Sequence, residues 1–296
     1  MRDLLQMRIA LSFFLIACLL ACQRSADQEW PNPAPALWEV HNADGQLEGW
    51  LFGTVHALPD GVEWRTPRLD SALAQTEKLV VEVADLNDSS AIADEFARLS
   101  RSDRPLPPLE ERVPQQDRAA ITRLITQAGS SDASWTHVKS WGAALILANA
   151  TRQNSDSSNG VDRWLLRQHP DAMELEGAAQ QFHMFDNMSR AEQSHLLISV
   201  AQEAAAAPAL RDASLKAWLT GDLRVLKNQS SQGLLANPQL RETLLTKRNR
   251  NWVDKLDTAF PTFGPLFIAV GAGHMIGADG LPQALSKEGY VIKRIQ

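Results

Sequence analysis

The strongest constraint on the fold is a pattern of residues that occurs once near each end of the chain. The apolar residues 49–52 lead into Gly-Thr-Val-His at 53–56, and the apolar residues 266–270 lead into Gly-Ala-Gly-His at 271–274. Each Gly-x-x-His follows a predicted buried strand and precedes a predicted helix and a further strand. The order strand, helix, strand predicts an α/β fold, in which two βαβ-like halves form a central sheet.

The other predicted elements follow from apolar periodicity and from turn and cap residues. Strands are predicted at 37–40, 49–52, 79–83, 172–176, 266–270 and 290–295, with a hairpin turn at 42–45. Helices are predicted at 67–75, 140–150, 161–168 and 281–287, and a capping box of Ser189 and Glu192 opens another. The middle of the chain is therefore predicted to be a helical insertion between the two α/β halves, and 172–176 a third buried strand.

The first residues have the composition of an export signal. Residues 1–8 carry Arg2 and Arg8, and residues 9–21 are almost wholly apolar. About 13 apolar residues are too few to span a bilayer comfortably and are typical of a signal-peptide core. The residues before Cys22, Leu-Leu-Ala, resemble the lipobox of bacterial lipoproteins, in which the cysteine is acylated. An ordinary cleaved signal and a short uncleaved anchor are the alternatives.

We therefore expect a lipoprotein signal peptide at 1–21, a polar, proline-rich tether at 22–36 and one α/β domain at 37–296. Gln23 follows the cysteine, which in the bacteria that this segment resembles favours the outer membrane. The expected location is the periplasmic side of the cell envelope, with the membrane contacted through the lipid.

Replacing Cys22 with serine should abolish acylation and release the protein from membranes, because serine offers no thiol to the lipid. Fatty-acid labelling followed by membrane fractionation measures both effects. Cys18 also follows a lipobox-like Leu-Ile-Ala and serves as the control position. Undiminished labelling of the Cys22→Ser variant would contradict the assignment and point to Cys18.

Composition excludes several classes of protein. The formal charge of −6 at pH 7 provides no basic surface for nucleic acid. Cys18 and Cys22 are the only cysteines, so the predicted domain contains neither a disulfide nor a thiolate. Any metal ion in the domain must be held by His, Asp or Glu side chains.

His56 and His274 each lie just beyond the C-terminal end of a predicted buried strand, where open α/β sheets gather ligands and catalytic groups. Gly53, Gly271 and Gly273 are expected to let the backbone turn tightly and approach a ligand closely. Histidine readily serves as a metal ligand or proton carrier, although a structural role at the strand ends is the alternative. We expect the two imidazoles to face one cavity, less than about 10 Å apart if they share an ion.

Three acidic residues stand in predicted strands. Glu82 interrupts an apolar run, and a buried carboxylate needs a cation, a metal ion or several donors. Glu174 and Glu176 share one face of their strand by its period of two. A solvated position at the sheet edge is the favoured interpretation of Glu174, and Glu176 lies nearer the C-terminal end of the strand.

Arg248 falls on an apolar stripe in which Leu240, Leu244, Trp252 and Leu256 recur every four residues. A guanidinium that faces the core needs a carboxylate or an anionic ligand, because it cannot be neutralised. The sequence therefore predicts that Arg248 meets Glu82, Glu176 or a bound anion. An arginine that extends out to solvent along the helix surface is the alternative.

Together these motifs resemble the TraB/GumN family, which is related to the Tiki proteases. The resemblance begins with a tryptophan-containing strand pair and continues to the C-terminus in order and spacing. Its matched positions are 53–56, 80–82, 160–162, 175–177 with Gln181, Trp218 with 221–222, Arg248 with Asn249, and 271–274. Gly177 departs from the pattern, since the family usually has threonine there.

The resemblance implies a Tiki/EreA/ChaN-like α/β fold and a metal-dependent hydrolase, with a peptidase of peptide or protein substrates as the leading hypothesis. His56 and His274 would bind the metal ion, with Glu82 or Glu176 as a further ligand or the general base. Arg248 would stabilise an oxyanion or orient a carboxylate. The supporting residues would be Gly53, Thr54, Gly271, Gly273, Gln181 and Asn249.

The expected metal is manganese, zinc or cobalt, since imidazole and carboxylate donors do not choose among them. Two further functions stay open. One is a non-enzymatic lipoprotein that binds a ligand such as haem, with His56 or His274 as the axial ligand. The other is an accessory protein of envelope or exopolysaccharide assembly, for which neither histidine would matter.

Overall fold

The computed structural model describes residues 30–86, 89–151 and 155–296. The predicted signal peptide, Cys22 and most of the predicted tether lie outside these residues. Residues Asn32–Gln296 form one compact unit. Within the described residues, no helix combines the length and the apolar character needed to cross a bilayer.

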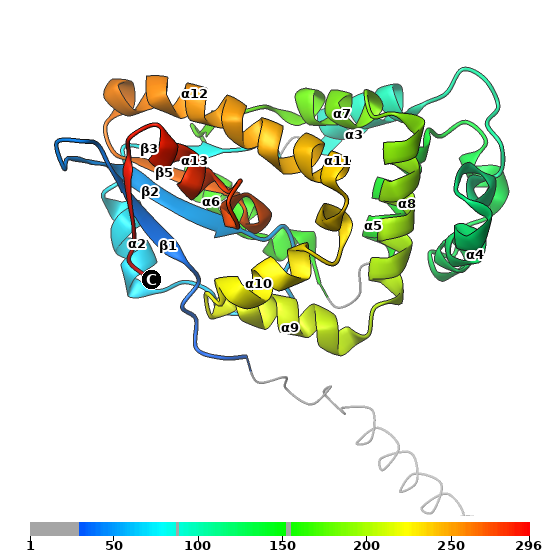
Figure 1. Cartoon of the computed structure of the whole chain (residues 1–296), viewed down its shortest axis with the longest axis horizontal. Coiled ribbons are helices and arrows are strands. Elements are labelled where there is room, and N and C mark those ends of the chain that lie inside the picture. The colour runs from blue at the N-terminus through cyan, green and yellow to red at the C-terminus, as the bar shows by residue number, and fades with distance from the viewer. Residues whose placement is uncertain (1–29, 87–88, 152–154) are drawn as a thin grey trace, which may run out of the picture. The chain divides into compact units, whose positions relative to one another are not determined.

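The core of this unit is a six-stranded sheet with the order β4-β3-β5-β2-β1-β6 (Figure 1). Its strands are β1 (Leu37–His41), β2 (Leu47–Thr54), β3 (Lys78–Val81), β4 (Met173–Glu174), β5 (Leu266–Gly271) and β6 (Val291–Arg294). Strands β2, β5, β3 and β4 are parallel neighbours, whereas β1 runs antiparallel to both β2 and β6. The mixed α/β class predicted from the sequence is confirmed.

The two βαβ-like halves share this sheet by interleaving. Strand β5 of the C-terminal half lies between β2 and β3, and β2 and β1 of the N-terminal half lie between β5 and β6. Within each half, two strands that follow each other along the chain are therefore separated in the sheet by strands of the other half. The arrangement makes β2 and β5 direct parallel neighbours, with Thr54 opposite Gly271, so the two Gly-x-x-His motifs leave the sheet side by side.

The prediction of a third buried strand at 172–176 is wrong in length and burial. Strand β4 has two residues at the edge of the sheet, and Glu174 is exposed. The backbone N–H groups of Glu176 and Gly177 both donate to the carbonyl of Glu82, which turns the chain away from the ladder. Leu175 is fully buried, whereas Met173 is only partly buried against the same hydrophobic cluster.

The helices mostly lie between β3 and β5 in sequence, as the predicted insertion requires. They are α2 (Pro67–Ala74), α3 (Ser89–Ser100), α4 (Arg118–Gln127), α5 (Ser140–Ala150), α6 (Val161–Gln168), α7 (Ala178–Asp186), α8 (Arg190–Ala205), α9 (Pro208–Leu219), α10 (Leu223–Ser230), α11 (Pro238–Arg241), α12 (Lys247–Phe263) and α13 (Leu281–Lys287). Helices α4, α5 and α8 pack around a hydrophobic cluster of their own, and the capping box of Ser189 and Glu192 opens α8.

Both faces of the sheet are covered. Trp252 and Leu256 of α12, with Leu281 and Leu285 of α13, join the sheet residues of a second hydrophobic cluster. On the opposite face, the ring of Phe52 stacks on Trp64, which in turn meets Trp164 of α6 edge-on. Side chains that follow the strands are therefore held by a rigid, two-sided core.

The helix that carries Arg248 contains a change of winding. Helix α11 ends at Arg241, a π turn spans Glu242–Thr246, and α12 begins at Lys247. A period of four exceeds the 3.6 residues of an α-helical turn, so a regular helix would rotate the stripe away from the core. The wider π turn keeps Leu240, Leu244 and Arg248 on one face, and such turns are frequent at functional sites.

Candidate active site

In the first Gly-x-x-His motif, the exposed histidine contacts a buried carboxylate. His56 Nδ1 lies 2.8 Å from Asp162 Oδ2, and Thr54 Oγ1 donates to Asp162 Oδ1 over 2.5 Å. The His56 side chain is 64% exposed, whereas that of Asp162 is 9% exposed. Because the carboxylate accepts, the hydrogen-bond network assigns the proton to Nδ1, so Nε2 carries the lone pair of the neutral ring.

Asp162 reaches His56 because of the glycine two residues before it. A Cβ on Gly160 would stand 2.5 Å from the carbonyl oxygen of His56, so only glycine permits this approach. Val161 N–H donates to the carbonyl of Val55 over 3.0 Å, which fixes the start of α6 against the motif. The Gly-x-Asp pattern thus supplies a partner for His56, a role that the sequence did not reveal.

The second Gly-x-x-His holds a buried histidine. His274 lies in a 3-10 turn at Ala272–Met275, its side chain is 5% exposed, and its ring packs 4.3 Å from that of Trp252 between centroids. His274 Nδ1 lies 2.6 Å from Asn249 Oδ1, and Arg248 Nη1 donates to Nε2 over 3.0 Å. Burial lowers the pKa of His274 to about 3, so the ring is neutral at neutral pH.

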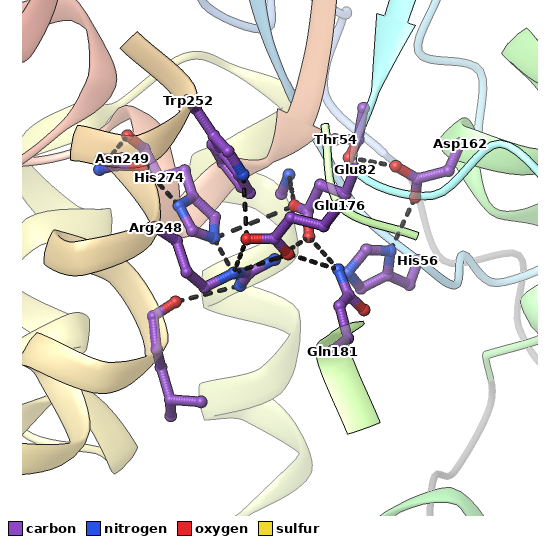
Figure 2. A network of polar contacts seen from close by, with 12 residues as sticks. Thr54, His56, Glu82, Asp162, Glu176, Gln181, Arg248, Asn249, Trp252 and His274 are labelled. Carbon is purple, nitrogen blue, oxygen red and sulfur yellow. Dashed lines mark hydrogen bonds and ion pairs between the residues drawn. The ribbon is translucent and has the colours of Figure 1, made fainter. Parts of the chain in front are cut away.

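Both histidines lie beside Gly271. Figure 2 shows His56 and His274 on either side of the Glu82 and Glu176 carboxylates. A Cβ on Gly271 would lie 3.8 Å from His56 Nε2, 3.9 Å from His274 Cδ2 and 3.2 Å from Glu82 Oε1. Glycine at this position therefore keeps open a small space that both imidazoles and a carboxylate face. The parallel register of β2 and β5 produces this meeting, although 53–56 and 271–274 lie near opposite ends of the chain.

The three motif glycines differ in what their surroundings require. None of Gly53, Gly271 and Gly273 has a positive φ. A Cβ on Gly53 would stand 3.0 Å from the Cα of Ala272, so this glycine lets the two motifs pack against each other. A Cβ on Gly273 would meet side-chain atoms at ordinary contact distances, so the backbone does not require glycine there.

Arg248 lies at the centre of the polar network, as the apolar stripe predicts. Its Nη2 donates to Glu82 Oε2 over 2.6 Å and to Glu176 Oε2 over 2.8 Å. Its Nε lies 3.0 Å from Glu176 Oε1, and its Nη1 also donates to the carbonyl of Leu244. Burial alone would lower the pKa of the guanidinium, but the two carboxylates raise it, so Arg248 keeps its charge.

The two glutamates have different surroundings. Glu82 Oε1 accepts the backbone N–H of Gly271 over 2.7 Å and lies 4.0 Å from His274 Nε2, on the side of the histidines. Burial would raise the pKa of Glu82, but the charges of His274, Arg248 and His56 and the Gly271 hydrogen bond outweigh it and hold the pKa at about 2.

Glu176 is instead bound on all sides by donors of the protein. Arg248 contacts both oxygens, and Trp252 Nε1 donates to Oε1 over 2.9 Å. Gln181 Nε2 lies 3.0 Å from Glu82 Oε2 and 3.4 Å from Glu176 Oε2, so it bridges the pair. This saturation makes Glu176 the structural counter-ion of Arg248 and leaves Glu82 as the carboxylate that faces the histidines.

Asn249 and Trp218 hold the two motifs from behind. Asn249 Nδ2 donates to the carbonyl of Asp279 over 2.7 Å, which fixes its Oδ1 toward His274 Nδ1. Trp218 Nε1 donates to the carbonyl of Gly53 over 2.8 Å within the core. The sequence placed Trp218 in the family pattern without a role, and only the fold shows that it supports the first motif.

The donor set partly fits a metal ion. In both histidines an oxygen atom contacts Nδ1, which is the usual support of a metal-binding imidazole. His56 Nε2 and the Cδ2 edge of His274 lie beside Gly271. Across residues 30–86, 89–151 and 155–296, however, no group of three or more His, Cys, Asp or Glu side chains is arranged to hold an ion. The contact from Arg248 to His274 Nε2 is the specific obstacle.

Acidification should destabilise chelator-treated protein through His274. Its pKa falls from 6.5 to about 3 on folding, so between these values only the unfolded chain binds the proton, and the free energy of unfolding drops as the pH falls. Glu82, lowered from 4.5 to about 2, adds to this loss below pH 4.5. Urea unfolding at pH 6.5 and pH 4.5 measures the effect.

His274→Gln removes the titrating group and should show a smaller loss of stability over that interval. His195→Gln, at an exposed position of α8, is the matched control and should behave as the wild type. An equal loss in the wild type and the His274→Gln variant would show that other groups cause the acid sensitivity.

The chain matches a known protein family over most of its length. A family model described as the TraB/PrgY/gumN family matches residues 36–294. No curated protein and no solved structure matches the chain significantly. The matched range contains every described residue of the polar network, from Thr54 to His274. The chain therefore belongs to the TraB/PrgY/gumN family.

Proposed function

We propose that the protein is a metal-dependent hydrolase of the bacterial cell envelope that cleaves peptide bonds. One observation carries the proposal: His56 Nε2, the edge of His274 and Glu82 Oε1 all face the space above Gly271. Asp162 and Asn249 hold the opposite nitrogens of the two rings. Rings fixed in this way are suited to bind a divalent ion as neutral imidazoles.

His56, His274 and Glu82 would hold the ion in this proposal. A bound divalent ion supplies polarisation of the scissile carbonyl and a lowered pKa of water. Glu82 suits a ligand better than a general base, because its pKa of about 2 is far below the operating pH of a base. The exposed face of His56 is where a substrate from solvent reaches the site first.

Several finer features belong to the same proposal. The fold would be of the Tiki/EreA/ChaN-like type, and the ion would be manganese, zinc or cobalt. A lipid on Cys22 would hold the domain on the periplasmic side of the outer membrane. Peptides or proteins of the envelope would be the substrates, which agrees with an acidic chain that offers nucleic acid no basic surface.

Metal analysis of the purified protein tests the proposal. The wild type should bind one divalent ion and hydrolyse an unstructured protein, and the His56→Ala/His274→Ala double variant should do neither. His195→Ala should retain both properties, because this side chain is exposed on α8. A wild type that binds no ion, or a double variant that keeps its ion, contradicts the proposal. A Soret band after addition of haem, lost in the double variant, would favour the haem-binding alternative.

Asp162→Asn should lower metal affinity by about 10–100-fold, the usual effect of removing a carboxylate behind a metal-binding histidine. The amide no longer accepts from both Thr54 Oγ1 and His56 Nδ1, so the ring loses its orientation. Isothermal titration with zinc measures the change, and Asp171→Asn, whose carboxylate is exposed and pairs with Lys78, is the control. An unchanged affinity would mean that His56 does not depend on Asp162.

A further inference from the structure

All the N–H donors of the Arg248 guanidinium are engaged by the protein itself. Its Nε and Nη2 donate to Glu176, Nη2 also donates to Glu82, and Nη1 donates to the carbonyl of Leu244 and to His274 Nε2. The side chain is only 12% exposed. Arg248 is therefore an internal cation and a hydrogen-bond donor to the imidazole, with no donor left for a substrate.

These contacts divide into two groups. On one side, Nε and Nη2 hold Glu176, a carboxylate that Trp252 and Gln181 also satisfy. On the other side, Nη1 and Nη2 reach His274 Nε2 and Glu82 Oε2. The second group consists of two of the three residues that the proposed function gives to the metal ion. The direct conflict lies at His274 Nε2, because Arg248 contacts Glu82 through Oε2 and leaves Oε1 on the side of the histidines.

Arg248 and a metal ion cannot both bind His274 Nε2. The ring has one lone pair on Nε2, and it cannot accept a hydrogen bond from Arg248 and bind a metal ion at the same time. A guanidinium and a divalent ion also repel each other at this range, because both are positive and the Arg248 side chain is largely buried. Either the ion displaces the Nη1 contact, or Arg248 keeps the ion away from His274.

We propose that Arg248 is a built-in competitor of the metal ion, and that metal loading exchanges its contacts with His274 and Glu82 for coordination to the ion. The proposal rests on the proposed function. Glu176 anchors the guanidinium during the exchange, since its contacts through Nε involve neither metal ligand. The π turn at Glu242–Thr246 ends two residues before Arg248 and provides a place where the helix can adjust.

Zinc titration of Arg248→Gln, with the full chain, tests the exchange. Glutamine is neutral and no longer occupies His274 Nε2, so zinc should bind at least about tenfold more tightly than in the wild type. The same variant should gain more thermal stability from zinc than the wild type gains, because the ion then replaces the missing positive charge beside Glu82. Arg250→Gln, at an exposed position of the same helix, should match the wild type.

Arg248→Lys covers the case in which Arg248→Gln does not fold without zinc. Lysine keeps the charge but cannot contact Glu176, Glu82 and His274 together, so its zinc affinity should rise above that of the wild type. Folding of Arg248→Gln only when zinc is present also supports the exchange.

Each outcome separates the two proposals. If the wild type binds zinc and both Arg248 variants bind it equally or more weakly, the exchange is overturned and the proposed function stands. If only the Arg248 variants bind zinc, the competition is supported and the proposed function of the wild type fails. If no protein binds zinc, manganese or cobalt, both proposals are overturned.

Discussion

Arg248→Leu should lower the free energy of unfolding of chelator-treated protein by about 3–5 kcal/mol, the cost of leaving buried charges without their partner. The leucine would strand Glu82 and Glu176, whose side chains are 12% and 5% exposed. The donors that remain to them in the described part of the chain are Gln181, Trp252 and the N–H of Gly271. Urea unfolding at neutral pH measures the loss.

Lysine at the same position should restore only part of this stability, because it lacks the planar pair of donors that spans both carboxylates. Arg250→Leu is the matched control on the same helix, and its exposed ion pair with Glu242 should contribute no more than about 1 kcal/mol. A wild-type unfolding curve for Arg248→Leu would mean that the two glutamates are satisfied without the guanidinium.

Glu82→Gln should reduce metal affinity by at least about 100-fold and abolish hydrolysis, since loss of a ligand costs more than loss of its supporting group. Glu176→Gln should instead act mainly on stability, with metal affinity within about tenfold of the wild type, because its carboxylate supports Arg248 and does not face the ion. The difference follows from geometry: Glu82 Oε1 faces the histidines, whereas both oxygens of Glu176 are bound by Arg248 and Trp252.

Zinc titration and hydrolysis of an unstructured protein, measured on both variants, distinguish the two carboxylates. Glu174→Gln is the control in the adjoining strand, because that side chain is exposed and accepts the backbone N–H of Ala84, outside the polar network. If Glu176→Gln loses the ion and Glu82→Gln retains it, the roles of the two glutamates are the reverse of those proposed.

The sequence by itself determined the features that depend on local pattern. Apolar runs with flanking glycines predict the strands that end at the two Gly-x-x-His motifs, because burial of a strand is visible in its composition. The apolar stripe through Leu244 and Trp252 placed Arg248 inward, and the cost of a buried guanidinium then required an acidic partner. Glu82, interrupting an apolar run, was recognisable as one candidate for that partner, beside Glu176 and a bound anion.

The tertiary structure decided which of these residues meet and in what state. Interleaving of the halves makes β2 and β5 neighbours, and their register brings His56 and His274 above Gly271. Which strands pair depends on contacts between segments that are distant in sequence. The periodicity of the apolar residues indicates only which face of a strand is buried, so it does not predict the pairing. Asp162 also became the partner of His56 only through the packing of α6.

The fold also places two similar motifs in different environments. His56 is largely exposed on a carboxylate, whereas His274 is buried between Asn249, Arg248 and Trp252, with its pKa lowered to about 3. Along the chain, each histidine has the same predicted neighbours, a strand before and a helix after. Desolvation and hydrogen bonds from distant segments set the protonation state of a side chain, so that difference belongs to the tertiary structure alone.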